Sequence, residues 1–94
     1  MQIIKAKKDA KEFVEDLKEI KDYDGLHRFI FWDPELNVGG KHGWTEIMYY
    51  SNTGAFFRYG EGQGWHDQIA TRMDEKETIE FVWENRKYIN AELR

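Results

Sequence analysis

The chain has no cysteine, only one proline and no long run of apolar residues. Without cysteine there can be neither a disulfide framework nor a thiolate zinc site. No stretch approaches the roughly 20 apolar residues that a membrane-spanning helix needs. The opening residues, MQIIKAKKDAKEF, also lack the apolar run of a signal peptide. We therefore expect a soluble, cytoplasmic protein with no membrane partner.

An excess of basic residues is absent as well. The formal net charge is −4, and acidic and basic residues are interspersed along the chain. A protein that grips nucleic acid regardless of base sequence usually presents a basic stripe. Nucleic acid is therefore a disfavoured partner, although the composition does not exclude it.

Aromatic residues, by contrast, are abundant. They make up 16% of the 94 residues, and hydrophobic residues together make up 40%. Disordered chains are poor in aromatic residues, and this length is close to the common domain size. The sequence predicts one folded domain over residues 1–94.

Hydrophobic periodicity and turn signals divide the first half of the chain into short elements. QIIKAK predicts a strand over residues 2–6. Asp9 and Glu12 have the D-x-x-E spacing of a capping box, which predicts a helix from Asp9 to about Asp22. Runs of aromatic and β-favouring residues then predict three strands. These strands cover residues 26–32, 44–50 and 55–59.

The remaining segments predict connections and a closing helix. Residues 33–43 contain the single proline and three glycines, so we expect a loop there. SNTG at 51–54 predicts a tight turn, because Asn and Gly tolerate a positive φ. Residues 67–73 alternate weakly and form either a fourth strand or an irregular segment. Asp74 and Glu77 repeat the capping box and predict a helix over 75–92.

The predicted order is β-α-β-β-β-(β)-α. This order indicates an α+β fold, in which an antiparallel β-meander of three to five strands carries two amphipathic helices. Short connections place both helices on one face of the sheet.

Both faces of the predicted sheet carry aromatic side chains, because residues alternate between faces along a strand. Along residues 26–32, Leu26, Arg28, Ile30 and Trp32 alternate with His27, Phe29 and Phe31. Residues 44–50 divide into Trp44, Glu46, Met48 and Tyr50 against Thr45, Ile47 and Tyr49, and residues 55–59 divide into Ala55, Phe57 and Tyr59 against Phe56 and Arg58. Two helices can cover only one of these faces. We therefore expect a partner protein, or a second copy of the chain, to cover the other face.

Two glycine-rich segments, NVGGKHGW (37–44) and GEGQGWHD (60–67), are the strongest candidates for a site. In a meander, the connections after the first and third strands of the sheet emerge at the same end. We therefore expect the two segments to be neighbours in space, with Asp33 at their base. Their polar and aromatic residues are Lys41, His42, Trp44, Glu61, Trp65, His66 and Asp67. The glycine spacing matches neither a P-loop nor a dinucleotide fingerprint.

These observations favour a small, non-catalytic protein-binding or regulatory protein, such as an inhibitor or adaptor. Its small size and its acidic, cysteine-free composition suit a protein encoded by a phage or mobile element. It would dock through an aromatic sheet face and the Gly/Trp loops, with homodimerisation through the same face as the closest rival. We expect no cofactor and no metal. The candidate binding residues are Trp44, Trp65, Tyr49, Arg58, Tyr59, Lys41 and His66.

Two other classes of function stay open. One is a minimal hydrolase or nuclease that uses His42, His66 and Asp67, because histidine titrates near neutral pH. The other is a nucleotide or single-stranded nucleic-acid binder that stacks bases on Trp44 and Trp65.

Overall fold

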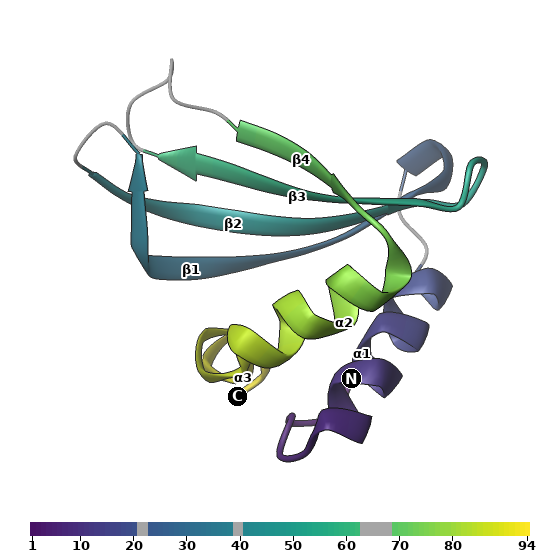
Figure 1. The fold of residues 1–94 in the computed structure, drawn as a ribbon, viewed down its shortest axis with the longest axis horizontal. Helices are drawn as coiled ribbons and strands as arrows, with labels where there is room; N and C mark the ends of the chain where they lie inside the picture. Colours follow the sequence, from purple (N-terminus) through teal and green to yellow (C-terminus); the bar gives the residue numbers. More distant parts are fainter. Residues whose placement is uncertain (21–22, 39–40, 63–68) are drawn as a thin grey trace.

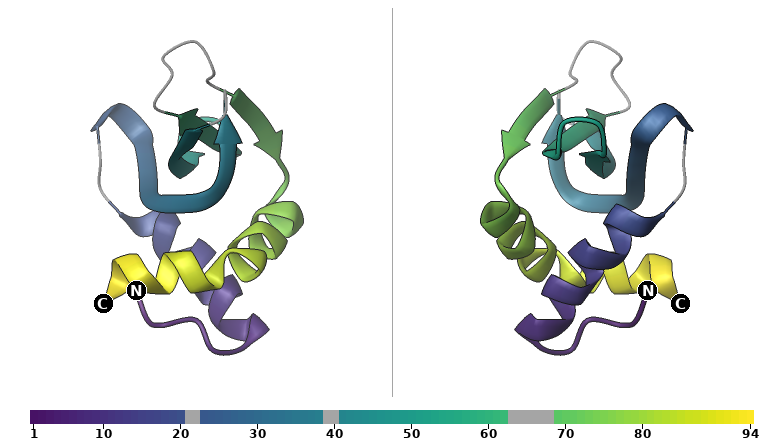
Figure 2. Two further views of the ribbon diagram at one scale, coloured as in Figure 1. Left: turned by 90° about the vertical axis from the view of Figure 1, so that its left-hand side faces the viewer. Right: turned by 90° about the vertical axis from the view of Figure 1, so that its right-hand side faces the viewer.

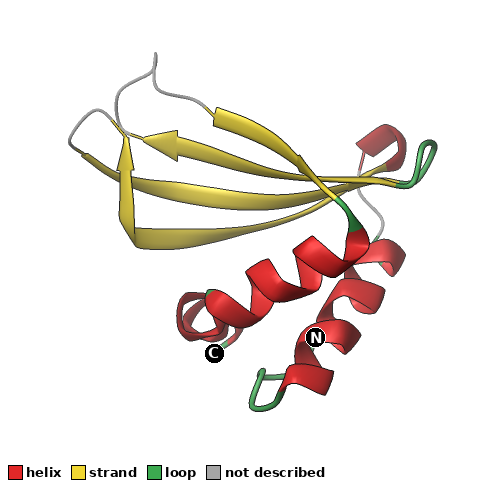
Figure 3. Cartoon of the chain, in the orientation of Figure 1, coloured by secondary structure: helices red, strands yellow, loops and turns green. Residues whose placement is uncertain are grey.

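The computed structural model describes residues 1–20, 23–38, 41–62 and 69–94. A four-stranded antiparallel sheet in the order β1-β2-β3-β4 lies against a layer of three helices, so the fold is α+β (Figures 1 and 3). A short 3₁₀ turn, Tyr23–Gly25, precedes the sheet. The helices are α1 (Lys7–Glu19), α2 (Glu75–Glu84) and α3 (Arg86–Leu93), and the strands are β1 (Leu26–Val38), β2 (Lys41–Tyr50), β3 (Ala55–Gly62) and β4 (Ile69–Met73).

The helices lie on one side of the sheet (Figure 2). None of the helices among these residues is long and apolar enough to cross a membrane. The strands predicted over residues 26–32, 44–50 and 55–59 are present as parts of β1, β2 and β3, and residues 69–73 are a true fourth strand. The tight turn at 51–54 is also present, with Gly54 at φ 71° and its N–H donating to the Tyr50 carbonyl over 2.8 Å.

The predicted loop over residues 33–43 is wrong, because most of this segment is strand. β1 continues to Val38, which pairs with Lys41 of β2, and the register shifts between Asp33 and Val38. The shift accommodates Pro34, which cannot donate a ladder hydrogen bond and is tolerated on an edge strand or at a bulge. β1 is such an edge strand. Near its end it bends sharply away from the helices (Figure 1).

The predicted strand over residues 2–6 is also wrong. Residues 1–5 have no regular secondary structure and lie in the helix layer (Figure 1). Ile4 is nevertheless held in place, because its N–H donates to Asn90 Oδ1 over 2.8 Å and its carbonyl accepts from Asn90 Nδ2 over 2.9 Å. A side-chain amide of α3 thus supplies the two hydrogen bonds that a neighbouring strand would otherwise make.

Helix α1 begins at Lys7, and not at Asp9 as the sequence predicts. Asp9 occupies the third helical position, where its carboxylate accepts from the N–H groups of Lys5 (2.9 Å) and Ala6 (2.8 Å). These two bonds lower the pKa of Asp9 below its ordinary value of 3.8. The predicted pairing with Glu12 does not form the cap. Asp9 instead reaches back over the first turn, as the acidic member of a capping box does.

The C-terminal helix breaks in two at Asn85, whereas the sequence predicts one helix over 75–92. Asn85 has φ −103° and ψ 15°, and its Nδ2 donates to the Phe81 carbonyl over 2.9 Å. An asparagine side chain that bonds to a nearby carbonyl competes with the helix. The predicted capping box is confirmed at the start of α2. The Glu77 N–H donates to Asp74 Oδ1 over 2.7 Å, and the Asp74 N–H donates to Glu77 Oε1 over 3.0 Å.

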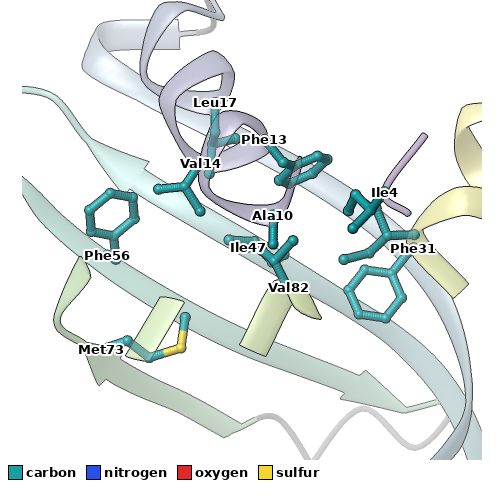
Figure 4. Close-up of a cluster of buried hydrophobic side chains, with 11 residues drawn as sticks. Ile4, Ala10, Phe13, Val14, Leu17, Phe31, Ile47, Phe56, Met73 and Val82 are labelled. Atoms are coloured by element: carbon teal, nitrogen blue, oxygen red, sulfur yellow. The ribbon is translucent and has the colours of Figure 1, made fainter. Parts of the chain in front are cut away.

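The hydrophobic core fills the space between the helices and the facing side of the sheet (Figure 4). The sheet contributes alternate residues of each strand, as the period of 2 requires. Helix α1 contributes a stripe of apolar residues at helical spacing. Helices α2 and α3 and the N-terminal Ile4 contribute the remaining buried side chains. The buried apolar cluster is Ile4, Ala10, Phe13, Val14, Leu17, Phe31, Ile47, Phe56, Met73, Val82 and Ile89.

Candidate functional site

One face of the sheet is turned away from the described helices (Figure 2). We call it the open face. Register and alternation place its side chains in cross-strand rows, such as Arg28–Met48–Phe57–Arg72 and Ile30–Glu46–Tyr59–Ala70. Its described side chains are those of Leu26, Arg28, Ile30, Trp32, Trp44, Glu46, Met48, Tyr50, Ala55, Phe57, Tyr59, Ala70 and Arg72.

The open face concentrates the exposed apolar side chains of the structure. Among the described residues, four large hydrophobic side chains are exposed: Ile30 (40%), Trp44 (46%), Tyr50 (37%) and Met1 (40%). The first three all lie on the open face, whereas Met1 is the chain terminus. Single exposed apolar residues are ordinary, but a cluster on one face marks an interaction surface.

Two pairs of aromatic side chains in contact lie at opposite ends of the open face. Trp32 and Trp44 face each other across β1 and β2, with ring centroids 5.1 Å apart and planes at 72°. Tyr50 and Phe57 make an edge-to-face contact at 5.7 Å and 89°. Such edge-to-face pairs are favourable because of the ring quadrupoles. The pairs therefore fix the rings as a preformed surface.

An ion pair crosses the open face between these ends. Arg28 Nη1 donates to Glu46 Oε1 over 3.4 Å, and the Glu46 side chain is only 12% exposed. The carboxylate thus lies low in the sheet, with the more exposed arginine over it. A second molecule could cover this part of the face without leaving Glu46 buried and unpaired, which would be costly.

A hollow lies at the β4 side of the open face, next to the turn between β2 and β3. Its volume is about 470 Å³, and it is open to solvent. Two of its lining side chains, those of Ala55 and Ala70, are small. It is lined by Met48, Tyr50, Thr53, Ala55, Phe57, Ala70 and Arg72. In the sequence, the signal for this hollow is the presence of two alanines among the aromatic residues of one face.

Two of the predicted binding residues lie on the helix-facing side. Tyr49 is half-buried between His27 (ring centroids 5.6 Å apart) and Phe56 (4.8 Å). Arg58 is exposed at the border of α2, where its guanidinium lies 5.4 Å from the centre of the Phe81 ring. The sheet separates both residues from Trp44 and Tyr59, so the four cannot act together on one surface.

The structure carries β1 and β3 to the same end of the sheet, as the meander predicts, since Gly43 pairs with both Asp33 and Gly62. Asp33 is buried there, and Thr45 Oγ1 donates to its Oδ2 over 3.1 Å. Of its predicted neighbours, Trp44 lies on the open face, and the side chains of the others lie outside what the structure describes. Trp65, His66 and Asp67 fall within residues 63–68, and the side chains of Lys41, His42 and Glu61 are not described either.

The shared loop site therefore stays a prediction. No group of three or more His, Asp or Glu side chains that could hold a metal ion occurs in the part of the chain that the structure covers.

A second cavity, of about 550 Å³, lies where α1, β3 and the start of α2 meet. Lys18 of α1 contacts Glu75 of α2 and Glu15 of its own helix there. These carboxylates, Glu75 foremost, raise the pKa of Lys18 above its ordinary 10.5. The cavity is lined by both signs of charge, and its lysine is already paired. The open face is therefore the better candidate.

Comparison with protein-family models, with curated proteins and with solved structures finds no match for this chain.

Proposed function

We propose that this protein is a non-catalytic binding protein, an inhibitor or adaptor, that docks onto another protein through the open face of its sheet. The observation that carries the proposal is the grouping of Ile30, Trp44 and Tyr50, exposed on one face that no described helix covers. Trp and Tyr are enriched among the residues that dominate binding energy at protein interfaces.

The energetics of the face agree with this proposal. Burying a large apolar side chain completely stabilises a complex by about 1.5–3 kcal/mol relative to leaving it exposed. Three half-exposed anchors in fixed positions can offset part of the translational and rotational cost of association. The aromatic pairs reduce the further cost of ordering side chains, because Trp44 and Tyr50 are already held by Trp32 and Phe57.

The alternatives draw less support from the described residues. For single-stranded nucleic acid, Trp44 offers a stacking surface, but Arg28 is already paired with Glu46 and a basic track beside the ring is needed for the phosphates. The hydrolase hypothesis depends on His42, His66 and Asp67, whose side chains the structure does not describe.

The test is an affinity purification from native lysate with four forms of the tagged full-length chain. These are the wild type, Ile30→Asp, Trp44→Ala and the control Ala91→Asp, which adds the same carboxylate at an exposed position of α3. We expect at least one protein to be enriched by the wild type and the control, and lost with both open-face variants. Equal recovery by all four forms would contradict the proposal.

A sedimentation experiment on the isolated protein separates the partner from a second copy. A dimer of the wild type that Ile30→Asp dissociates would assign the open face to homodimerisation instead. A monomer, together with a partner that is lost in the purification with Ile30→Asp, supports the proposal.

A further inference from the structure

The hollow on the open face has room for a side chain of a second molecule, since its volume is about 470 Å³ and it is open to solvent. Tyr50 and Phe57, in edge-to-face contact, line it together with the small side chains of Ala55 and Ala70. Met48, the cross-strand partner of Phe57, also lines it and can adapt to the shape of an occupant, because its side chain is flexible. An apolar side chain therefore fits this hollow.

Arg72 adds a charge at the rim of the hollow. It pairs with Phe57 across β3 and β4, so its side chain rises on the open face, where it is exposed. Within the described part of the chain, Arg72 makes no ion pair. Arg28, at the opposite edge of the same cross-strand row, is paired with Glu46. The arginine at one end of the row is thus paired within the protein, whereas Arg72 at the other end can bind a carboxylate of a second molecule.

A guanidinium recognises a carboxylate through parallel hydrogen bonds in a fixed geometry. We infer that the hollow binds a segment of a partner protein that places an aromatic or aliphatic side chain between Tyr50, Phe57 and Ala70, with an adjacent Asp or Glu side chain on Arg72. This inference depends on the proposed function and specifies the chemistry of the partner.

A second copy of the chain fits this site less well. To satisfy Arg72, it would have to present an unpaired carboxylate from its own open face. The described side chains of that face include one carboxylate, that of Glu46. It is only 12% exposed and is paired with Arg28. The described part of the face is therefore not complementary to itself at Arg72, and a partner with an acidic residue beside an apolar one is the better match.

The experiment uses a displayed library of random short peptides, selected on the immobilised full-length chain. We expect the selected peptides to share an apolar residue next to Asp or Glu. A synthetic peptide of that kind should bind the wild type and lose about tenfold or more in affinity with Arg72→Glu. Ala70→Leu, which fills the hollow at an exposed position, should cause a similar loss. Lys11→Glu, the same charge reversal at an exposed position of α1, should have no effect.

A charge exchange makes the test specific to the ion pair. Replacing the acidic residue of the peptide by lysine should weaken binding to the wild type and restore binding to Arg72→Glu. A purely structural role of Arg72 could not produce this rescue. Melting curves of each variant confirm that the fold is retained.

The other outcomes overturn the inference. They are a library that yields no binder or only peptides without acidic residues, equal affinity of the wild type and Arg72→Glu, and a wild-type dimer that Ala70→Leu dissociates. A partner lost with Ile30→Asp but retained with Arg72→Glu would remove this inference and leave the proposed function standing. A partner unaffected by any open-face variant would remove both.

Discussion

Ile4 and Asn90 are 86 positions apart in the chain, yet the Asn90 side chain makes hydrogen bonds to both backbone polar groups of Ile4. Ile4 is 2% exposed and Asn90 8%. The first residues thus join the core through a side-chain amide of α3. The pair shows how this small domain closes its helix layer without a fifth strand.

Asn90→Ala should destabilise the protein by about 2–4 kcal/mol, because it leaves a buried N–H and a buried carbonyl of Ile4 without partners. Urea melts of the wild type and the variant measure the change. Asn52→Ala is the control, since Asn52 is exposed in the turn between β2 and β3 and should change the free energy of unfolding by less than about 0.5 kcal/mol. Equal stability of the two variants would show that the Ile4 contact is dispensable.

Asp9→Ala should lower stability at neutral pH, because the N–H groups of Lys5 and Ala6 lose their acceptor. The pKa of Asp9 is depressed in the folded state, so its contribution is complete above the ordinary value of 3.8 and is lost as the pH falls through the folded pKa. The difference between wild type and variant should therefore shrink in acid. Glu12→Ala, the residue that the sequence paired with Asp9, is the control and should melt like the wild type at every pH.

Lys18→Met should weaken the contact between α1 and α2, because Lys18 joins Glu75 of α2 to its own helix. The pKa of Lys18 is raised in the folded state, so its contribution is complete below 10.5 and is lost as the pH rises through the folded pKa. Thermal melts from neutral to strongly alkaline pH should show the variant and the wild type converging. Glu75→Gln should reduce stability more than Glu15→Gln, since Glu75 is the larger cause of the shift. The reverse order would contradict this role.

Trp44→Ala and Tyr49→Ala should have different effects on stability and binding, because the two aromatic side chains lie on opposite faces of β2. Trp44 is 46% exposed, and its loss should cost less than about 1 kcal/mol of stability while reducing binding. Tyr49 packs against Phe56 and His27 on the core side, and its loss should cost about 2 kcal/mol or more. Denaturant melts beside the binding measurement give both numbers. A large loss of stability with Trp44→Ala would make this residue structural.

Trp65→Ala tests the loop that the sequence singled out. If Trp65 is an anchor, affinity for the partner should fall by about 2 kcal/mol or more, and stability should change by less than about 1 kcal/mol. If the residue is part of the core, truncation should instead cost about 3–5 kcal/mol of stability. The same melts and binding assay distinguish the two results.

Much of the sheet follows from local sequence, and so does the cap of α2. Residues 26–32, 44–50 and 55–59 form strands because aromatic and β-branched side chains suit a half-buried pleated surface. The Asp74–Glu77 box and the turn at Gly54 form because each needs only partners a few residues away. Such short-range interactions can be recognised without knowing the fold.

Backbone pairing that residue preferences do not predict decided the rest. Pro34 and the nearby glycines predict a loop, yet the pairing of β1 with β2 draws most of that segment into the sheet. QIIKAK has the composition of a strand, but its backbone finds its partner in Asn90, which no local pattern reveals.

The candidate site also combines features that the sequence predicts with features that only the fold decides. Alternation along a strand was enough to put Trp44 and Tyr50 on the same side of β2, because the side-chain period of a strand is 2. The register of β1 against β2 was needed to add Ile30 to that face. Which face the helices cover is decided by packing across the whole chain, where Phe31, Ile47 and Phe56 join Ile4 and the helix residues in one buried cluster. The hollow likewise required the register of three strands, because its lining residues come from β2, β3, β4 and the turn between β2 and β3.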